Sequence, residues 1–396
     1  MSISHVTPQA REYAMTADLE KSNLHVTMLG LRSISGAQGG IETHVRKLAE
    51  ELTERGCKIT VLERARYAHS PCAVRGVDRI SLWSPKSPSL ETIIHSLIGV
   101  IYAGVRRPEI LHLHGIGPGL YAPLARMLGL KVVVTHHGED YNREKWGPVA
   151  RFVLRLGELA SGTAGAALIC VGPHTCIRLA EQGRDNVVHI PNGVKKVGEV
   201  APNLNVLDEL ALEPGRFLIC VGRLVPEKRQ LDLIRAFGRL PKSRKQWRLV
   251  LVGGADHESG YSRQVESEGR NNSQIVLAGM RTPNELAALY EAATAFALVS
   301  SHEGLPIVML EAMSYGKLIV ASDIPANRSL DLPEECYVPL GNVDQIVRRL
   351  EVVMDQYDAG TKPDWSAYLG RYDWSNIADE TKAIYKKVSN GSMHDH

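Results

Sequence analysis

Two glutamates, Glu303 and Glu311, are the side chains of this sequence that most clearly suggest chemistry. The stretch 300–313 begins as a polar loop and continues into an apolar run with helical spacing. Gly304 and Pro306 are typical of a helix start, where free backbone N–H groups attract anions. A separation of eight residues is a little over two turns. The pattern therefore predicts Glu303 just before a helix and Glu311 about two turns inside it, with both carboxylates on one side of the helix, beside an anion site.

A basic pair provides the charge opposite to these acids. Arg223 and Lys228 flank a turn that directly follows the apolar run 217–221. Such cations can clamp a diphosphate and neutralise the charge that grows on a leaving group. A pair of this kind is often only solvated surface. Its place at the carboxyl end of a predicted strand, like the Glu303 loop, favours the functional interpretation.

Two glycine-rich segments each follow a predicted strand. Gly36-Ala37-Gln38-Gly39-Gly40 opens a helix, and adjacent glycines let a phosphate or sugar approach the backbone. A plain strand–helix turn is the alternative. Gly115-Ile116-Gly117-Pro118-Gly119, followed by Asp140, imitates a dinucleotide fingerprint. Its third glycine is misplaced and Pro118 lacks an amide for pyrophosphate, so the sequence argues against NAD.

A histidine pair, His136 and His137, follows the predicted strand 131–135. Neighbouring strand residues point to opposite faces, so both rings cannot readily bind one metal ion. The pattern favours one histidine facing a ligand as a hydrogen-bond partner. A histidine held only for structural reasons is the alternative.

The bulk properties limit the possible classes of protein. At 396 residues the chain predicts two domains, and its 44% hydrophobic and 23% charged residues are typical of soluble globular proteins. Six cysteines without metal-ligand spacing indicate a reducing compartment. The sequence has neither an apolar run long enough to span a bilayer nor a recognisable signal peptide. We therefore expect a cytoplasmic protein, with contact to the inner face of the cell membrane left open.

The charge distribution bears on binding partners. The net charge of +2 gives no reason to expect a nucleic-acid partner. Residues 1–195 carry 23 Lys+Arg against 17 Asp+Glu, and the remainder carries 23 against 27. The basic first half favours an anionic membrane surface or acceptor, although ordinary surface variation explains it equally well. The most suggestive part is a basic, aromatic stretch with Arg143, Lys145, Trp146, Arg151, Phe152 and Arg155, for which an acceptor loop followed by a core helix is the alternative.

Alternating strand and helix patterns predict two doubly wound parallel-sheet domains with a cleft between the carboxyl ends of their strands. Strands are expected at 24–29, 58–62, 110–114, 131–135, 167–171 and 187–190, and then at 217–221, 248–252, 274–278, 295–299 and 318–321. The expected organisation is a flexible tail at 1–21, a first domain at 22–195, a linker at 196–213, a second domain at 214–371, and a final helix at 372–390 that crosses back to the first domain.

Taken together, these motifs resemble glycosyltransferases of family 4, which are retaining enzymes with the GT-B fold. The resemblance covers residues 24 to about 388. Glu303 and Glu311 match the E-x7-E motif of that family. The other matching segments are Gly39-Gly40-Ile41-Glu42, Thr135-His136-His137-Gly138-Glu139-Asp140, Pro191-Asn192-Gly193-Val194, Gly222-Arg223 with Glu227-Lys228, and Tyr372-Asp373-Trp374-Ser375.

The resemblance implies a role for each of these positions. Arg223 and Lys228 would bind the donor diphosphate, Glu311 the ribose hydroxyls, and Glu303 the donor sugar. His137 would lie beside the reacting sugar, with His136 as its rival for that place. Catalysis would rest on His137, Glu303, Arg223 and Lys228. Further donor contacts would come from Gly39, Gly40, Asn192, Gly279, Met280, Gly304, Leu305 and Pro306, and acceptor-side contacts from His136, Asp140 and Trp146.

The implied reaction is transfer of a hexose from a nucleoside-diphosphate sugar to a saccharide or lipid-linked saccharide, with retained anomeric configuration, in surface polysaccharide assembly. No Asp-x-Asp motif occurs in the chain, so we expect neither a metal nor another cofactor. Two alternatives remain open. One is other GT-B chemistry, such as sugar-nucleotide epimerisation, and the other is a non-catalytic nucleotide-sugar-binding subunit.

Overall fold

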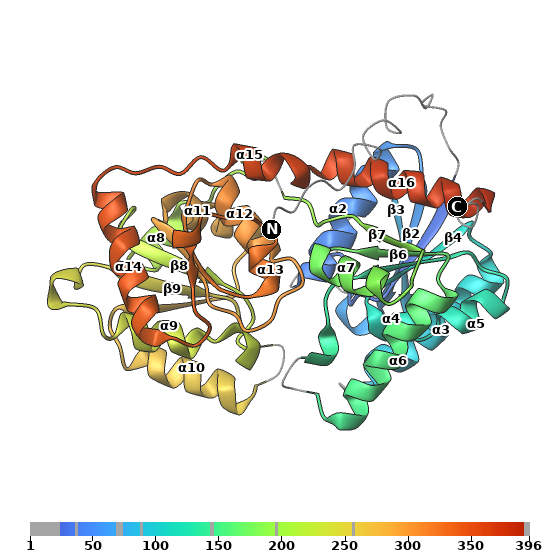
Figure 1. Cartoon of the computed structure of the whole chain (residues 1–396), viewed down its shortest axis with the longest axis horizontal. Coiled ribbons are helices and arrows are strands. Elements are labelled where there is room, and N and C mark those ends of the chain that lie inside the picture. The colour runs from blue at the N-terminus through green and yellow to red at the C-terminus, as the bar shows by residue number, and fades with distance from the viewer. Residues whose placement is uncertain are drawn as a thin grey trace.

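Two α/β units, each built on a parallel sheet, make up the computed structural model of the chain (Figure 1). It describes residues 24–35, 39–68, 74–87, 90–142, 146–194, 197–255 and 258–391. The predicted tail at 1–21, residues 36–38 of the first glycine-rich segment, and Arg143 and Lys145 lie outside these residues. Among the described residues, no helix is long and apolar enough to cross a bilayer.

The first unit has a seven-stranded sheet in the order β3-β2-β1-β4-β5-β6-β7. Its central strands are runs of apolar residues buried on both faces, as helices on either side of a parallel sheet require. The strands are β1 His25–Leu29, β2 Lys58–Arg64, β3 Val77–Leu82, β4 Ile110–His114, β5 Val132–His136, β6 Ala167–Cys170 and β7 Val187–His189. The helices are α2 Gly40–Glu54, α3 Glu91–Arg106, α4 Ile116–Gly119, α5 Ala122–Met127, α6 Pro148–Ala164 and α7 Pro173–Glu181.

The second unit has a six-stranded sheet in the order β10-β9-β8-β11-β12-β13. Its strands are β8 Phe217–Val221, β9 Arg248–Val252, β10 Ile275–Gly279, β11 Ala295–Leu298, β12 Leu318–Ser322 and β13 Tyr337–Val338. Its helices are α8 Asn205–Glu209, α9 Gln230–Phe237, α10 Gly260–Arg270, α11 Pro283–Ala292, α12 Ile307–Ser314, α13 Pro325–Arg328, α14 Val343–Asp358 and α15 Ser366–Leu369. The strand order reverses between β8 and β11, which is where ligands bind in such sheets.

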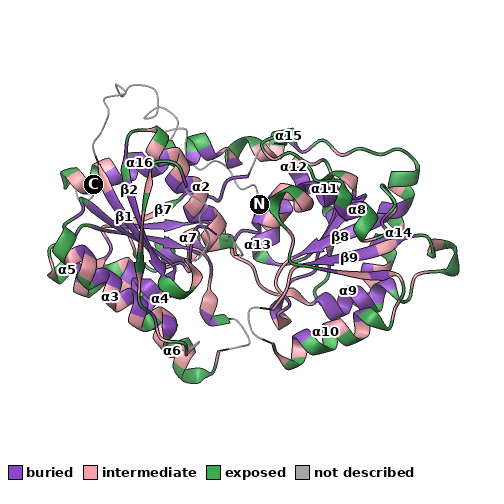
Figure 2. Ribbon diagram, turned by 180° about the vertical axis from the view of Figure 1, so that it is seen from behind, coloured by how far each residue is buried: buried purple, intermediate pink, exposed green. Residues whose placement is uncertain are grey.

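Burial separates the two units into distinct cores (Figure 2). Each sheet carries one apolar cluster on each face, so each unit has helices packed on both sides. Every strand pair described is parallel. The carboxyl ends of the strands therefore gather at one edge of each sheet, and the loops that follow them carry the predicted site residues.

The fold prediction is confirmed, and each predicted strand lies within two residues of its observed bounds at either end. Three local predictions need correction. The pattern missed two edge strands, β3, in which no residue is fully buried, and the two-residue β13. The segment 196–213 contains α8, whose Val206 and Leu207 join the core of the second unit. Finally, α12 begins at Ile307, so Glu303 precedes the helix as predicted, but Glu311 lies about one turn inside it rather than two.

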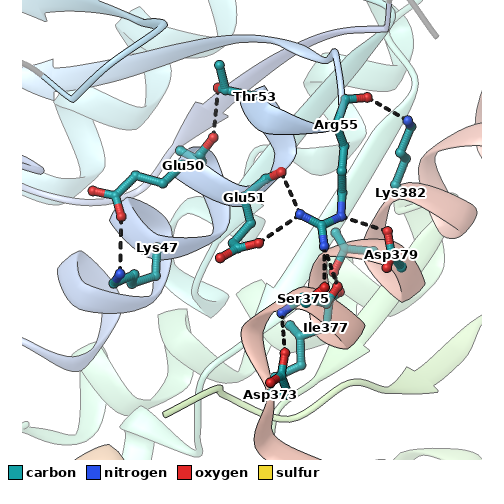
Figure 3. Close-up of polar contacts among 12 residues, drawn as sticks. Lys47, Glu50, Glu51, Thr53, Arg55, Asp373, Ser375, Ile377, Asp379 and Lys382 are labelled. Atoms are coloured by element: carbon teal, nitrogen blue, oxygen red, sulfur yellow. Dashed lines mark hydrogen bonds and ion pairs between the residues drawn. The ribbon is translucent and has the colours of Figure 1, made fainter. Parts of the chain in front are cut away.

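The last helix, α16 (Trp374–Asn390), packs on the first unit after the chain has completed the second. Trp374, Ile377 and Tyr385 belong to the same apolar cluster as residues of β1 and α2. Figure 3 shows the polar part of this contact, at the end of α2. Arg55 donates to Asp379 Oδ1 at 2.6 Å and to Ser375 Oγ at 2.7 Å, and Lys382 Nζ donates to the Arg55 carbonyl at 2.7 Å. The helix thereby fastens the second unit to the first.

Candidate active site

An ion pair joins the two charged loops of the second unit. Lys228 ends the short 3₁₀ helix η3 (Pro226–Lys228) after β8, and its Nζ lies 2.5 Å from Oε1 of Glu303. Both side chains are largely buried, and Ser301 N donates to the Glu227 carbonyl at 2.8 Å, which ties the two loops together. Lys228, from the predicted basic pair, and Glu303, the first of the two glutamates, are therefore in direct contact.

The loop before α12 touches the first unit directly. A Cβ added to Gly304 would lie 2.0 Å from the carbonyl oxygen of His137, far inside any real contact. A Cβ on Gly138 would lie 3.2 Å from Gly304 Cα. Asn192 Nδ2 also donates to the Leu305 carbonyl at 3.3 Å. Only glycine at position 304 allows the two loops to approach this closely.

The second glutamate lies one turn inside α12. Glu311 accepts a hydrogen bond from the Tyr290 hydroxyl at 3.3 Å, and burial holds the pKa of Tyr290 well above its usual range, so the phenol stays a donor. Glu311 lines a cavity of about 140 Å³ between α2, α11 and α12. Tyr290, Tyr315, Arg46, Lys47 and Arg281 line the same cavity. A carboxylate held by a phenol at a cavity wall is suited to accept hydrogen bonds from hydroxyl groups.

The two neighbouring histidines have different surroundings. His136 is buried, its Nε2 lies 2.8 Å from Glu158 Oε1, and its Nδ1 accepts from Gly138 N at 3.2 Å. Both of its nitrogens are used inside the first unit, which argues against a direct acceptor contact. His137 is only partly buried, and its backbone carbonyl meets Gly304 of the second unit. The geometry thus favours His137 over His136 as the cleft histidine.

Glu158 on α6 contacts both His136 and Arg178. The Arg178 Nη2 donates to Glu158 Oε1 at 2.6 Å. Burial alone would raise the pKa of Glu158, but the hydrogen bonds from His136 and Arg178 outweigh it and lower the pKa to about 2. This stabilisation is complete above the carboxylate's unfolded pKa of about 4.3. It is lost as the pH falls toward 2.

We expect Glu158→Gln to lower the free energy of unfolding by about 3 kcal/mol near neutral pH, because a buried charge loses its partner. Urea denaturation at pH 7 and at pH 3 measures the effect, which should shrink at the lower pH. Glu266→Gln, which removes an exposed pair with Arg270, is the matched control and should change stability by less than about 1 kcal/mol. An equal loss in both variants would contradict the account of Glu158.

The sequence reasoning missed two further histidines. His114 ends β4, and its Nδ1 lies 3.2 Å from His137 Nε2. His44, on α2, lies edge-on to the His137 ring at 4.8 Å and places Nδ1 2.8 Å from Asn192 Oδ1. Burial lowers the pKa of His44 to about 4 and the pKa values of His114 and His137 well below their usual range. The signal was available, since β4 lies next to β5 and both end in histidine.

The remaining predicted residues occupy less central positions. Asn192 is buried behind the Leu305 loop with both amide groups used, so its place is supporting rather than open. In the first unit, Gly39 caps α2 and Gly40 faces the Ile307 side chain. In the second unit, Gly279 has a left-handed φ of 66° and Met280 is half exposed. Arg223 lies two residues after the end of β8, and Pro306 caps α12. Asp140 begins the 3₁₀ helix η2 (Asp140–Asn142), and Trp146 precedes α6.

Comparison with known proteins agrees with this geometry. Residues 38–196 match the family model "Glycosyltransferase Family 4", and residues 208–367 match "Glycosyl transferases group 1". A GDP-mannose:cellobiosyl-diphosphopolyprenol alpha-mannosyltransferase of Xanthomonas oryzae pv. oryzae is 26% identical over 283 residues, covering 69% of this chain and 72% of that protein. A UDP-Gal:alpha-D-GlcNAc-diphosphoundecaprenol alpha-1,3-galactosyltransferase of Escherichia coli is 27% identical over 261 residues, covering 62% and 66%.

Solved structures show the same fold at lower identity. A sucrose-phosphate synthase of Thermosynechococcus elongatus superposes with a TM-score of 0.80 at 19% identity, covering 93% of this chain and all of that one. Two facing parallel-sheet units with the site between them define the GT-B fold. Within that class, the chain belongs to the family 4 type, and it is related to enzymes that build lipid-linked saccharides.

Proposed function

We propose that this enzyme transfers a hexose from a nucleoside-diphosphate sugar to a saccharide or lipid-linked saccharide, with retention of configuration and without a metal. The observation that carries the proposal is the Lys228–Glu303 pair beside the start of α12, in contact with His137 of the other unit. A cation, a helix start and a sugar-reading carboxylate thereby converge on one small volume. The comparisons support it, since both relatives named above are described as using a nucleotide sugar and a diphosphate-lipid acceptor.

In the proposed complex, the donor phosphates lie at the amino end of α12, next to Lys228 and Arg223. Glu311 binds the ribose hydroxyls, and Glu303 binds sugar hydroxyls once the diphosphate has taken over Lys228. As the bond from the sugar to the diphosphate breaks, Lys228 and the free amides of α12 stabilise the leaving phosphate. The acceptor hydroxyl attacks from the same face and gives its proton to the departing phosphate. His137 borders the sugar from the first unit.

Incubation with UDP-, GDP- and dTDP-sugars, in EDTA and with a polyprenyl-diphosphate saccharide, tests this function. We expect acceptor-dependent release of the nucleoside diphosphate, and an α-linked product from an α-linked donor by NMR. Donor epimerisation without acceptor would indicate the alternative GT-B chemistry. Donor binding without turnover under any condition would indicate a non-catalytic subunit.

We further propose that the first unit contacts an anionic membrane where a lipid-linked acceptor resides. Helix α6 supports this, because Val149, Phe152, Leu156 and Leu159 are exposed and recur on it at helical spacing. Arg151 and Arg155 are exposed on the same helix. Apolar side chains flanked by arginines are suited to the headgroup region of an anionic bilayer.

Replacing Phe152 and Leu156 with serine should weaken sedimentation with phosphatidylglycerol vesicles by about tenfold, since each side chain loses apolar burial. Val352→Ser, which alters an exposed aliphatic side chain on α14 of the second unit, is the control and should sediment like the unaltered protein. Sedimentation that is equal in all three proteins, or absent in the unaltered one, would reject the membrane contact.

A further inference from the structure

Three histidines from three different elements converge beneath the cleft. Ligand nitrogens of His44, His114 and His137 all lie within 4.8 Å of one another, and this is the one such group of potential metal ligands within the part of the chain that the structure describes. They come from α2, the end of β4 and the residue after β5. His44 and His114 are fully or almost fully buried, and His137 is half-buried on the cleft side.

Hydrogen bonds fix which nitrogen of His44 is available. Asn192 donates its amide nitrogen to the Leu305 carbonyl, so its amide oxygen must accept from His44 Nδ1. His44 therefore carries its proton on Nδ1, and Nε2 presents a lone pair. That nitrogen is buried without a hydrogen-bond partner among the described residues, as is Nε2 of His114. A buried lone pair on His44 Nε2 beside two further imidazoles is a place where a bound water or ion supplies the missing partner.

A proton shared between two imidazole nitrogens explains only the contact between His114 and His137. The 3.2 Å approach of His114 Nδ1 to His137 Nε2 can hold one shared proton, which leaves His44 Nε2 unsatisfied. A cation would take one lone pair from each ring, with His114 binding through Nδ1 and carrying its proton on Nε2. Zinc binds neutral imidazole at about 2.0–2.1 Å and accepts three histidines with one open position. The His44–Asn192 bond is the kind of support that orients a metal-ligating histidine.

We propose that His44, His114 and His137 form a binding site for a divalent transition-metal ion, with zinc as the best match. A tetrahedral site requires the nitrogens to draw together to about 3.4 Å, which small side-chain rotations achieve. The ion takes the His137 nitrogen that borders the donor sugar, so its occupation inhibits transfer. This inhibition rests on the proposed function, whereas the binding does not. The site is regulatory and is distinct from the metal-free transfer reaction.

Metal titrations without any donor test the binding. We expect Zn²⁺ to raise the melting temperature of the EDTA-treated protein, and Co²⁺ to give the visible absorption of a tetrahedral nitrogen site, which Zn²⁺ then removes. His114→Asn and, separately, His44→Asn should weaken both signals by about 10- to 100-fold. His189→Asn, which alters an exposed histidine on β7, is the matched control and should bind Zn²⁺ like the unaltered protein. Two variants are used so that a folding defect in one does not decide the test.

The transfer assay adds a second readout. Because the bound ion inhibits transfer, the unaltered protein should be less active in Zn²⁺ than in EDTA. The ratio of these two activities should rise toward one in His114→Asn and His44→Asn, and it should stay low in His189→Asn. The site would be overturned if the unaltered protein showed no thermal or spectral response to either ion. It would also be overturned if His114→Asn and His44→Asn bound the ions as tightly as the unaltered protein does. Metal binding by a protein that never transfers sugar would sustain the site and reject only the proposed function.

Discussion

Replacement of Lys228 with alanine should reduce kcat/KM for sugar transfer by about 10²- to 10³-fold, the effect typical of losing one preorganised charge contact to a transition state. Lys228 is the cation that the structure places against Glu303. We therefore expect the loss to appear in kcat as well as in donor affinity. Steady-state kinetics with a saturating acceptor measure both.

The matched control is Lys242→Ala, which removes an exposed lysine from the 3₁₀ helix η4 (Lys242–Arg244) of the same unit. It should leave transfer within about twofold. Circular dichroism should show that both variants are folded, whereas the melting temperature should fall only for Lys228→Ala, because Glu303 loses its largely buried partner. A folded Lys228→Ala protein with undiminished turnover would contradict the diphosphate clamp.

Gly304→Ala should lower kcat/KM by about 100-fold, although it removes no functional group. The added methyl would lie 2.0 Å from the His137 carbonyl oxygen, so the two loops must separate by more than about 1 Å. A displacement of that size at a reacting centre costs about 10²-fold in rate. The donor is bound mainly by the second unit, so nucleoside-diphosphate affinity should fall far less than turnover. Comparison of calorimetric affinity with kcat separates the two effects.

Gly260→Ala is the control for this prediction, because a Cβ at Gly260 meets nothing within 4 Å. It should transfer sugar as the unaltered enzyme does. Gly304→Ala with normal turnover would mean that the contact between the Gly304 and His137 loops is not part of the productive conformation.

The sequence predicted most of the fold because its strands are unambiguous. Largely apolar runs such as 217–221 and 248–252 lie between turn residues, and the observed bounds of these two strands are the same as the predicted ones. The edge strand β3 escaped because Val77–Leu82 has few buried residues and no continuous apolar run. The short helix α8 escaped because five residues are too few to show a helical period.

The site was predicted unevenly for a related reason. Residues in motifs at strand ends, such as Lys228 and Glu303, could be grouped because parallel strands deliver their loops to one edge. The pairing of those two side chains depends on how two loops fold, which spacing does not determine. His44 belongs to the helix that follows a glycine-rich loop and was not considered. Its contact with Asn192 joins residues 148 positions apart. Such a contact arises only from the packed units.

The central claim is that a nucleoside diphosphate binds between Lys228, Glu311 and the start of α12. The most direct test is thermal denaturation with UDP, GDP and dTDP in EDTA, for the unaltered protein and for Lys228→Ala. A nucleotide at about 100 times its Kd stabilises a protein by about 2.7 kcal/mol, which is a shift of several degrees. We predict this shift for at least one nucleotide and its loss in Lys228→Ala. No shift with any of the three, or an equal shift in both proteins, would contradict the account.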